Sequence, residues 1–386
     1  GFDPSWVVKS MFEVTRDIFE SDAVIAMFLR MAQDLFGFPP DIPGTGFLSS
    51  LLSSVFFTPG TLGVVGGVHS WAHAAVKIIL ANGGNIFTRH EVDKVIIESG
   101  KATGVRLTDG TEVEARKLVV STLDPYTLCF RLIGKEHLDW QILRKVENLE
   151  RRLGTPAYYH WALQEPPNYK AASINPDINE TMMMLLISND PHALVREHAI
   201  RTLGRMPDDL QLIMINYSLM DKTRVPTGKS CVLTGQFVLP ANALTEREWM
   251  EFKSSHAEQV IKLWQEHAPN MSWDNVIGYL PHTPYDSCKL ANMAPTGCFS
   301  VIDNVASQLG RFRPIPELAN HRTPIKNLYA TGAAWPPFGM AGASQGYNCY
   351  KVVAQDLELE KPWEEGGHLF RHLNPCQLLF TPLKFL

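Results

Sequence analysis

Residues 327–343 read NLYATGAAWPPFGMAGA and contain the pattern that decides the fold class. The pattern predicts a short strand at 327–331 and a helix at 343–357. Between them, a turn rich in small residues is expected at 332–342. A strand that runs through small residues into a helix leaves backbone N–H groups at the helix N-terminus, where they attract anionic or electron-rich ligand atoms. Taken alone, however, the stretch is better explained as a tight turn between packed elements.

A second glycine-rich unit lies in the first third of the chain. Gly-Gly at 66–67 precedes an apolar run at 71–80 that predicts a helix, and Asn-Gly-Gly at 82–84 ends it. Xaa-Gly pairs at 99–100 and 109–110 are typical of hairpin turns. The strands expected around these turns are 85–88, 91–98, 102–107, 111–115 and 118–121, the last being short and apolar like a buried parallel strand.

The remaining segments predict helices at the N-terminus and a mixed domain in the middle. Two helices are expected within residues 1–37, the first beginning at Asp3-Pro4 and the second near Ser21-Asp22. Thr245 and Glu248 form a capping box that opens a long helix. Strands followed by helices indicate an α+β domain. The expected elements of that domain are strands at 157–163, 181–187, 210–217 and 231–238 and helices at 192–203 and from 245.

Several short motifs match one family of proteins. They are VVSTLDP at 119–125, PTGK at 226–229, GRFRP at 310–314, RTPI at 322–325 and NLY at 327–329. Together with the two glycine-rich units, they make the sequence resemble flavin-dependent oxidoreductases of the phytoene desaturase and carotenoid isomerase type, within the wider amine-oxidase-like group. The resemblance covers about residues 60–357 and is most specific over 308–357.

The resemblance implies an α/β fold with a discontinuous, Rossmann-like FAD-binding domain and an α+β substrate domain. Residues 61–125 and 301–360 would form two parts of the FAD domain, and 126–300 would form the substrate domain. Residues 1–60 would be a helical segment that covers the substrate path. Residues 361–386 carry many large apolar side chains and few charges, so this tail is expected to dock on protein or on a membrane surface.

The implied cofactor is FAD, and the implied reaction is desaturation, saturation or isomerisation of an apolar, polyene- or lipid-like small molecule. The backbone of Val92 would meet the adenine side. Backbone N–H groups near Met340 and Ala341 would stabilise negative charge on the reduced ring, as an oxyanion hole does. No residue stands out as a general acid or base. The cofactor-binding residues implied by the resemblance are Val92, Ser121, Thr122, Gly332, Ala333, Met340, Ala341 and Gly342.

One motif of the family is absent. The family holds the FAD pyrophosphate with a strand, a GxGxxG turn and a helix, but the 386 residues contain no GxGxxG, and GVVGG at 63–67 is the nearest approach. We therefore expect a chain that lacks the N-terminal part of the FAD domain. It would be a fragment, one part of a split enzyme whose second chain supplies the GxGxxG segment, or a relative without the cofactor. The alternative is a non-catalytic structural or assembly subunit.

Composition excludes other classes of function. Lys and Arg number 35 against 40 Asp and Glu, a net charge of −5, which argues against a general affinity for nucleic acid. The six cysteines are scattered without a CxxC pair, and no signal peptide or membrane span is evident. This favours a cytoplasmic location, with peripheral membrane contact open. His69 and His73 have a metal-ligand spacing, but no third ligand is evident and no metal site is expected.

Two aromatic clusters leave alternatives open. Residues 158–161, Tyr-Tyr-His-Trp, alternate across an expected strand, where they would either line an apolar substrate tunnel or belong to the sheet core. Residues 335–338, Trp-Pro-Pro-Phe, lie beside the expected flavin turn. They would either form an aromatic wall over a substrate or simply pack against their neighbours.

Overall fold

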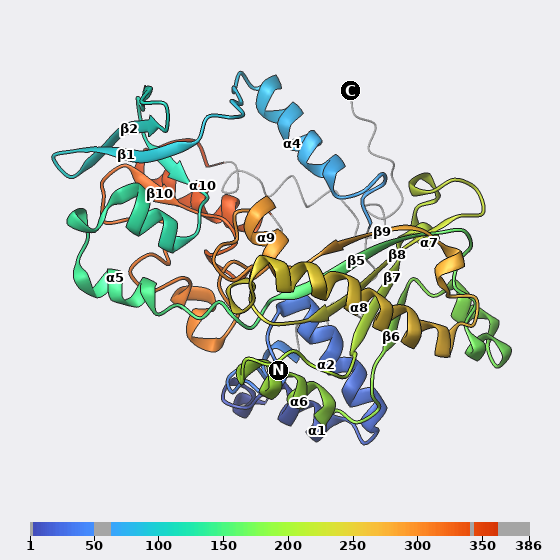
Figure 1. Cartoon of the computed structure of the whole chain (residues 1–386). Coiled ribbons are helices and arrows are strands. Elements are labelled where there is room, and N and C mark those ends of the chain that lie inside the picture. The colour runs from blue at the N-terminus through green and yellow to red at the C-terminus, as the bar shows by residue number, and fades with distance from the viewer. Residues whose placement is uncertain (1–2, 50–62, 340–342, 362–386) are drawn as a thin grey trace.

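The computed structural model describes residues 3–49, 63–339 and 343–361, which form a mixed α/β fold (Figure 1). Within these ranges the strands form three sheets. The two smaller sheets lie at one end of the molecule and the large sheet at the other, with helices around them. In the ranges described, no helix is both long and apolar enough to cross a membrane.

The first sheet is antiparallel and contains β1 (Val92–Glu98), β2 (Lys101–Leu107) and β3 (Glu112–Glu114). The two predicted Xaa-Gly turns join these strands, and the glycine of each has a positive φ. The strand expected at 85–88 does not form. Its residues are exposed loop, and Phe87 contacts the ring of His90 rather than a neighbouring strand.

The second sheet joins two segments that are about 200 residues apart in sequence. β4 (Val119–Ser121) pairs in parallel with β10 (Leu328–Ala330), and the apolar residues 118–121 had predicted a buried parallel strand there. Leu328 and Ala330 are in one core cluster with Trp335, whereas Tyr329 packs with α10 (Ser344–Asp356). The two segments assigned to one discontinuous domain therefore meet through backbone hydrogen bonds.

The third sheet has five antiparallel strands in the order β6-β7-β8-β5-β9. Four of them lie where the sequence predicts strands. β9 was not predicted, since its sequence VIGYLPH contains a glycine and a proline; proline is tolerated here because β9 is an edge strand. The strands are β5 (Pro156–Leu163), β6 (Met183–Leu186), β7 (Leu212–Asn216), β8 (Ser230–Phe237) and β9 (Val276–His282).

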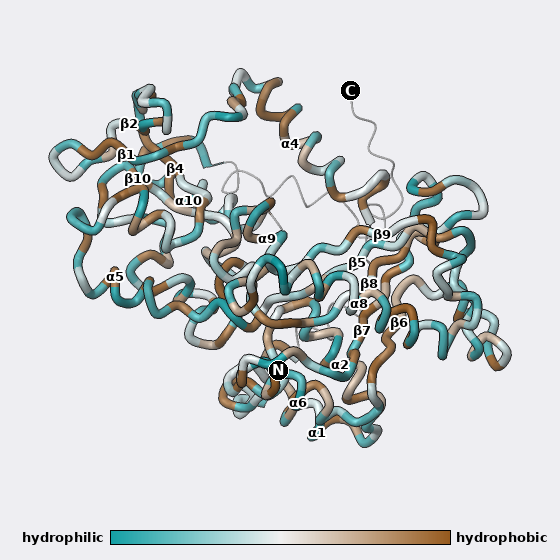
Figure 2. Tube along the Cα trace, in the orientation of Figure 1, coloured by the Kyte–Doolittle hydropathy of each residue, from teal (hydrophilic) through white to brown (hydrophobic). Residues whose placement is uncertain are grey.

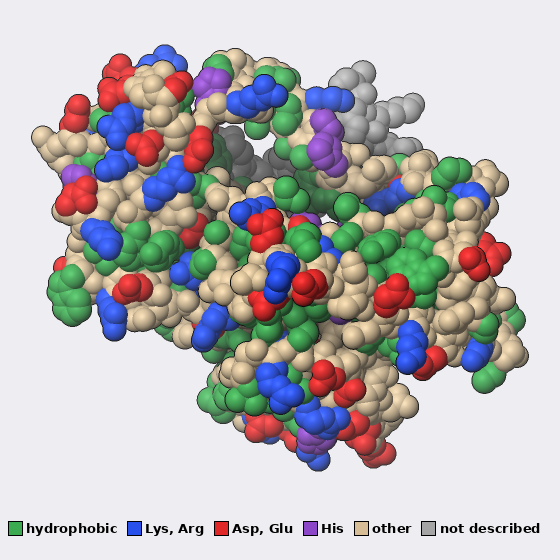
Figure 3. Space-filling view, in the orientation of Figure 1, with side chains coloured by type: hydrophobic (Ala, Val, Ile, Leu, Met, Phe, Trp, Pro, Cys, Tyr) green, Lys and Arg blue, Asp and Glu red, His purple; other side chains and the backbone are tan. Residues whose placement is uncertain are grey.

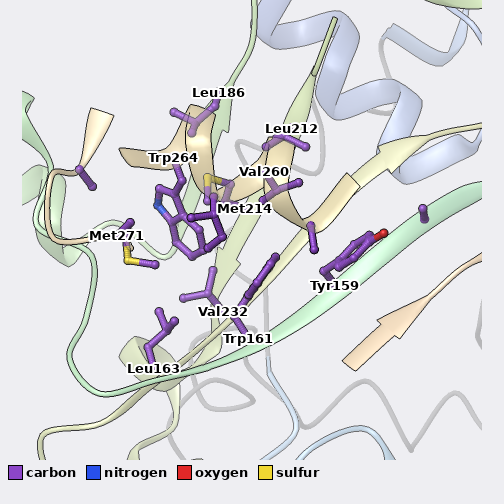
Figure 4. Packing of buried hydrophobic residues seen from close by; sticks show 14 of the residues in the cluster. Tyr159, Trp161, Leu163, Leu186, Leu212, Met214, Val232, Val260, Trp264 and Met271 are labelled. Carbon is purple, nitrogen blue, oxygen red and sulfur yellow. The ribbon is translucent and has the colours of Figure 1, made fainter. Parts of the chain in front are cut away.

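Helix α8 (Glu246–His267) covers one face of this sheet, and the predicted capping box of Thr245 and Glu248 begins it. Figure 4 shows the core between them, where Trp161 of β5 lies next to Trp264 of the helix with ring centroids 6.2 Å apart. Tyr159 is in the same cluster. Tyr159 and Trp161 therefore belong to the sheet core, and Trp161 also contributes to a cavity that His160 lines.

The N-terminal helices pack below the large sheet in Figure 1. The first expected helix is split into a 3-10 turn (Pro4–Val7) and α1 (Met11–Ile18), because Ser10 and Glu13 form a second capping box. The other α-helices of the described ranges are α2 (Asp22–Phe36), α4 (His69–Ala81), α5 (Trp140–Glu147), α6 (His192–Thr202), α7 (Tyr217–Met220) and α9 (Pro284–Leu290), and a π-helix spans Thr127–Ile133.

A buried arginine on α2 joins that helix to the large sheet. Arg30 donates from Nε to the carbonyl of Gln211 at 3.0 Å and from Nη2 to the carbonyl of Gly235 at 3.1 Å. Its Nη1 donates to Asp34 at 3.2 Å. Both ends of this contact are buried, so the helix is fixed on the face of the sheet opposite α8.

Arg313 joins the loop before β10 to the turn after it. The side chain is buried, and burial lowers the pKa of Arg313 to about 10, so the guanidinium stays charged at neutral pH. Its three nitrogens donate hydrogen bonds of 2.8–3.3 Å to backbone carbonyls only. The accepting carbonyls are those of Ser300, Ile302, Asp303, Gln308 and Ala333.

Arg313→Lys should lower the free energy of unfolding by at least about 3 kcal/mol. Lysine has three donors on one atom and leaves several buried carbonyls unpaired, each at a cost of about 1–3 kcal/mol. Chemical denaturation of both proteins measures the difference. Arg311→Lys, on an exposed residue two positions earlier, is the control and should change stability by less than about 0.5 kcal/mol. Equal effects of the two substitutions would contradict this assignment.

His256 on α8 is a buried histidine that stays neutral in the folded protein. Its ring stacks on Tyr159 with centroids 5.1 Å apart, and Nε2 lies 3.3 Å from Oε1 of Gln236. Burial lowers the pKa of His256 to about 4. The unfolded chain, with an ordinary histidine pKa near 6.5, takes up this proton first as the pH falls.

The free energy of unfolding should therefore fall as the pH drops from about 6.5 to 4, with His256 contributing a slope of about 1.4 kcal/mol per pH unit. His256→Phe should remove this part of the slope. His267→Phe, at the exposed end of the same helix, should keep it. Urea unfolding at several pH values measures the slopes, and the same slope in wild type and His256→Phe would disprove the assignment.

Candidate cofactor and substrate site

A cavity of about 520 Å³ lies at the carboxyl end of β4. Val92, Ser121 and Thr122, three of the residues implied for cofactor binding, line it together. Ser121 ends the strand and Thr122 follows it, while Val92 begins β1. In α/β folds, ligands bind in the crevice beyond the carboxyl ends of parallel strands, so this cavity is the candidate cofactor site.

Gly332 lies next to this cavity because it follows β10, the parallel partner of β4. The backbone N–H of Thr331 donates to the carbonyl of Ser121 at 2.9 Å. Gly332 has a φ of 108°, and a Cβ added there would lie 2.9 Å from the carbonyl oxygen of Thr122. The close approach of the two strand ends thus requires glycine at position 332, as the small-residue turn predicts.

The hydroxyl of Thr331 has no hydrogen-bond partner among the described residues, although it is buried. An unpaired buried hydroxyl is costly, so a polar ligand atom or a water molecule is expected beside it. The cavity, the glycine at 332 and this hydroxyl occur at the same strand ends. They fit the adenosine side of a dinucleotide, which needs bare backbone and a few polar groups.

Several residues that line this cavity were not predicted from the sequence, and Arg131 and Asn292 are two polar ones among them. Arg131 comes from the helical segment that follows β4, whereas Asn292 comes from a loop more than 160 residues later. Nη2 of Arg131 lies 2.6 Å from Oε1 of Glu91 and 3.1 Å from the carbonyl oxygen of Val92. This contact fixes the start of β1 at the cavity. No local motif marks either residue, because the contact depends on the tertiary fold.

The turn after Gly332 is held by polar side chains from three other segments. Arg313 bonds to the carbonyl of Ala333, the next implied cofactor residue. Asn304 accepts from the backbone N–H of Gly339 at 2.8 Å, and Gln345 donates to the carbonyl of Phe338 at 2.9 Å. The turn is thus fixed at both ends. Met340, Ala341 and Gly342 lie outside the described residues.

Trp335 belongs to the packing and not to a substrate wall. It is fully buried in the core cluster that also contains Leu328 and Ala330. Phe338 is half-buried and packs edge-on against Phe36 at the end of α2, with ring centroids 6.2 Å apart. Between the two interpretations of this aromatic cluster, plain packing is therefore the one that the structure supports.

The face of the large sheet opposite α8 carries a second cavity, of about 360 Å³. His160, Ala162 and Cys231 line it from β5 and β8, and Tyr217 and Arg224 line it from the connection between β7 and β8. Burial, together with the neighbouring His282, lowers the pKa of His160, so its ring is neutral near pH 7. The cavity combines apolar walls with few charges.

Helix α4 leaves its apolar side chains uncovered by the described residues. It has no buried residue, and Ile78 and Leu80 are 64% and 54% exposed. Figure 2 shows its hydrophobic character along most of its length, and Figure 3 shows a hollow beneath it. An apolar helix surface of this kind is typical of an interaction site.

The described residues contain no cluster of three or more His, Cys, Asp or Glu that could hold a metal ion. His69 and His73 do lie side by side on α4, with ring centroids 4.5 Å apart. The five cysteines of the described ranges are free thiols, of which Cys129, Cys298 and Cys349 are buried.

The fold is similar to those of solved oxidoreductases. An oxidoreductase from Methanosarcina mazei superimposes with a TM-score of 0.59 at 16% identity, over 90% of this chain and 68% of that one. A putrescine oxidase variant gives a TM-score of 0.56 at 12% identity, over 91% of this chain and 68% of that one. At these identities the likeness concerns the fold alone.

Curated relatives are similar to this chain in sequence. A limonene dehydrogenase subunit of Castellaniella defragrans is 27% identical over 78% of this chain and 57% of its own length. A phytoene desaturase (neurosporene-forming) of Cereibacter sphaeroides is 25% identical over 85% of this chain and 61% of its own length. The chain thus spans a little over half the length of these relatives.

A comparison of this sequence with models of protein families confirms the resemblance that the short motifs indicated. The model of the flavin containing amine oxidoreductases matches residues 5–273, well over half of the chain. This range includes β4, the sheet of β1–β3 and most of the large sheet. The chain therefore belongs to the flavin containing amine oxidoreductase family.

Proposed function

We propose that this chain forms one side of an FAD site and the substrate domain of an oxidoreductase that desaturates, saturates or isomerises an apolar, polyene- or lipid-like molecule. One observation carries the proposal. Val92, Ser121 and Thr122 line one cavity at the carboxyl end of β4, and Gly332 adjoins it after the paired strand β10. Relatives named as a phytoene desaturase and a limonene dehydrogenase subunit support the apolar substrate.

The residues of the first cavity would bind and orient the cofactor. Bound FAD would supply the redox chemistry, by accepting or giving a hydride equivalent. The start of β1 at Val92, fixed by Arg131, would offer backbone atoms to the adenine side. Thr331 would pair its buried hydroxyl with a polar atom of the ligand, and Gly332 would keep the strand ends free of side chains.

The second cavity would hold part of the substrate. Directly paired residues of a sheet share a face, and the pairs of His160 with Leu233 and with Leu280 therefore place all three on the face opposite α8. Leu280 is exposed there. This face would position an apolar substrate and exclude water, while the buried aromatic face keeps the sheet rigid.

A GxGxxG segment from outside these 386 residues would complete the site, in the same polypeptide or in a second chain. The chain lacks that motif, and GxGxxG turns bind the pyrophosphate at a helix N-terminus. Parallel sheets normally have more than two strands and are covered on both faces. The parallel sheet of β4 and β10 has only two strands, so further strands from such a segment would extend it. The uncovered apolar residues of α4 offer a surface on which such a segment would pack.

The 386-residue chain alone should bind FAD weakly, and Thr122→Trp should weaken this binding at least tenfold. The indole would fill the cavity that Thr122 lines. Val113→Trp, on exposed β3 outside the cavity, is the matched control and should leave the affinity unchanged. Equilibrium dialysis with FAD up to millimolar concentration measures the affinities.

Any other result of this experiment would contradict a particular part of the proposal. Tight, stoichiometric FAD binding by the wild-type chain would contradict the need for a completing segment. Equal affinities in wild type and Thr122→Trp would contradict the placement of the cofactor. If the protein also lacked FAD when completed by a GxGxxG segment, a non-catalytic role in assembly would be the better explanation.

The double substitution Ile78→Gln and Leu80→Gln should leave the free energy of unfolding of the chain within about 0.5 kcal/mol of wild type, because both side chains are exposed. It should also lower the binding of a dye for apolar surfaces. Val95→Gln and Ile133→Gln, in the buried core, serve as the contrasting pair and should destabilise strongly. A loss of more than about 1 kcal/mol in the α4 variant would show that this chain itself buries the face.

A further inference from the structure

The residues just before α4, 63–68, form a strap that reaches the large sheet. Val68, the last residue of the strap, lines the second cavity together with His160 of β5 and Cys231 of β8. The strap is therefore one wall of this cavity, and the sheet is another. The position of the strap decides how open the cavity is.

Two side chains from the connection between β7 and β8 hold the strap by its backbone. Oδ2 of Asp221 accepts a hydrogen bond from the N–H of Gly66 at 2.7 Å, and Nη2 of Arg224 donates to the carbonyl of Val64 at 3.1 Å. These two side chains also bind each other, since Nε of Arg224 donates to the same Oδ2 at 3.3 Å. We call Asp221 and Arg224 the clasp.

The clasp is held in place by its own neighbours. Oδ1 of Asp221 accepts hydrogen bonds from the N–H and the hydroxyl of Thr223, at 3.0 and 2.6 Å. The bonds from Thr223 and Gly66 lower the pKa of Asp221 to about 2, so its carboxylate is ionised near pH 7. The guanidinium of Arg224 lies over the ring of Tyr217, 4.8 Å from its centroid. Both hydrogen bonds to the strap are therefore charge-assisted, which makes them stronger than neutral ones.

The rest of the described chain gives the strap little other support. Within the described ranges, no other hydrogen bond joins residues 63–84 to the remainder of the chain. Helix α4, which continues the strap, has no buried residue, although it crosses from the large sheet toward the sheet of β1–β3 (Figure 1). Gly66 and Gly67 have φ values of 77° and 103°, and two successive glycines change their backbone conformation at little cost.

We propose that Asp221 and Arg224 control access to the second cavity by holding the strap over it. Loss of either hydrogen bond would let the strap move away from the sheet, with Gly66 and Gly67 as the hinge. The apolar molecule that enters the cavity would pass this barrier first. The proposal concerns access to the cavity alone and does not depend on the proposed redox function.

Cys231 supplies a probe of this access, because it lines the cavity and is a free, half-buried thiol. The full chain is treated with N-ethylmaleimide, and mass spectrometry of the peptide that contains Cys231 gives the labelling rate. Asp221→Ala and Arg224→Met should each raise this rate at least about fivefold, because each removes a hydrogen bond made by a charged group. Methionine keeps much of the length of arginine, so the cavity wall is largely preserved.

The two variants distinguish opening of the strap from a change in the ionisation of the thiol. Burial raises the pKa of Cys231, while the charge of Arg224 lowers it and the charge of Asp221 raises it further. Loss of Asp221 would therefore speed labelling even without motion, because the thiolate is the nucleophile. Loss of Arg224 would slow labelling by the same argument, so faster labelling of Arg224→Met requires opening of the strap.

Asp190→Ala is the matched control. Asp190 also accepts a hydrogen bond from a backbone N–H, that of His192, and pairs with an arginine, Arg196, but it does not line the cavity. This variant should label at the wild-type rate. Cys288, a half-buried thiol that does not line the cavity either, is the internal reference, and its rate should be the same in all the proteins.

Hydrogen–deuterium exchange gives a second readout that does not involve thiol chemistry. In both clasp variants the peptide that contains Gly66 should exchange faster, while a peptide within β5 should keep its protection. Equal labelling rates in wild type and both clasp variants would overturn the proposal. Faster labelling in Asp221→Ala alone would also overturn it, as a change in ionisation only. Faster exchange throughout β5 would do the same, because it would indicate general destabilisation.

Discussion

The hydrogen bonds of Arg313 are the interaction on which the geometry of the proposed cofactor side depends. One buried guanidinium binds the carbonyls of a loop with little regular structure, residues 300–308, and the carbonyl of Ala333 just after β10. Those carbonyls have no strand or helix to pair them. Because an unpaired buried carbonyl is costly, the loop and the turn can stay buried only where the arginine lies. The turn beside Gly332 is thereby fixed before any cofactor binds.

Local sequence predicted a strand at each of the two segments and a buried parallel strand at 118–121. That β4 pairs with β10 follows from the fold, because nothing in either segment names its partner. The candidate residues Val92, Ser121, Thr122 and Gly332 came from the family resemblance and not from the strand pattern. The structure places the first three around one cavity and Gly332 against Thr122. In the sequence, Arg313 was recognised only as one residue of the GRFRP motif at 310–314. Its function depends on carbonyls up to 20 residues away, and no periodicity marks them.

The missed elements share one physical cause, which is that their environment is set by the fold and not by their own composition. β9 is an edge strand with a glycine and a proline, and its propensity is poor. Conversely, residues 85–88 have the composition of a strand, but they find no neighbour to pair with. The aromatic run of β5 illustrates a third case: its alternation was evident, but only the position of α8 decides which face is core.

The large sheet and the cofactor side are connected by the same short loop that Arg313 organises. Asp303 accepts hydrogen bonds from the backbone of Leu153 and Gly154, at the entry to β5, while its own carbonyl binds Arg313. Asn304, the next residue, holds both Phe36 at the end of α2 and Gly339 in the turn. Two consecutive polar residues therefore connect the start of β5 and the end of α2 to the turn after β10. The proposed redox reaction would depend on that relative position, and the contacts of residues 303–304 would then align the two proposed cavities.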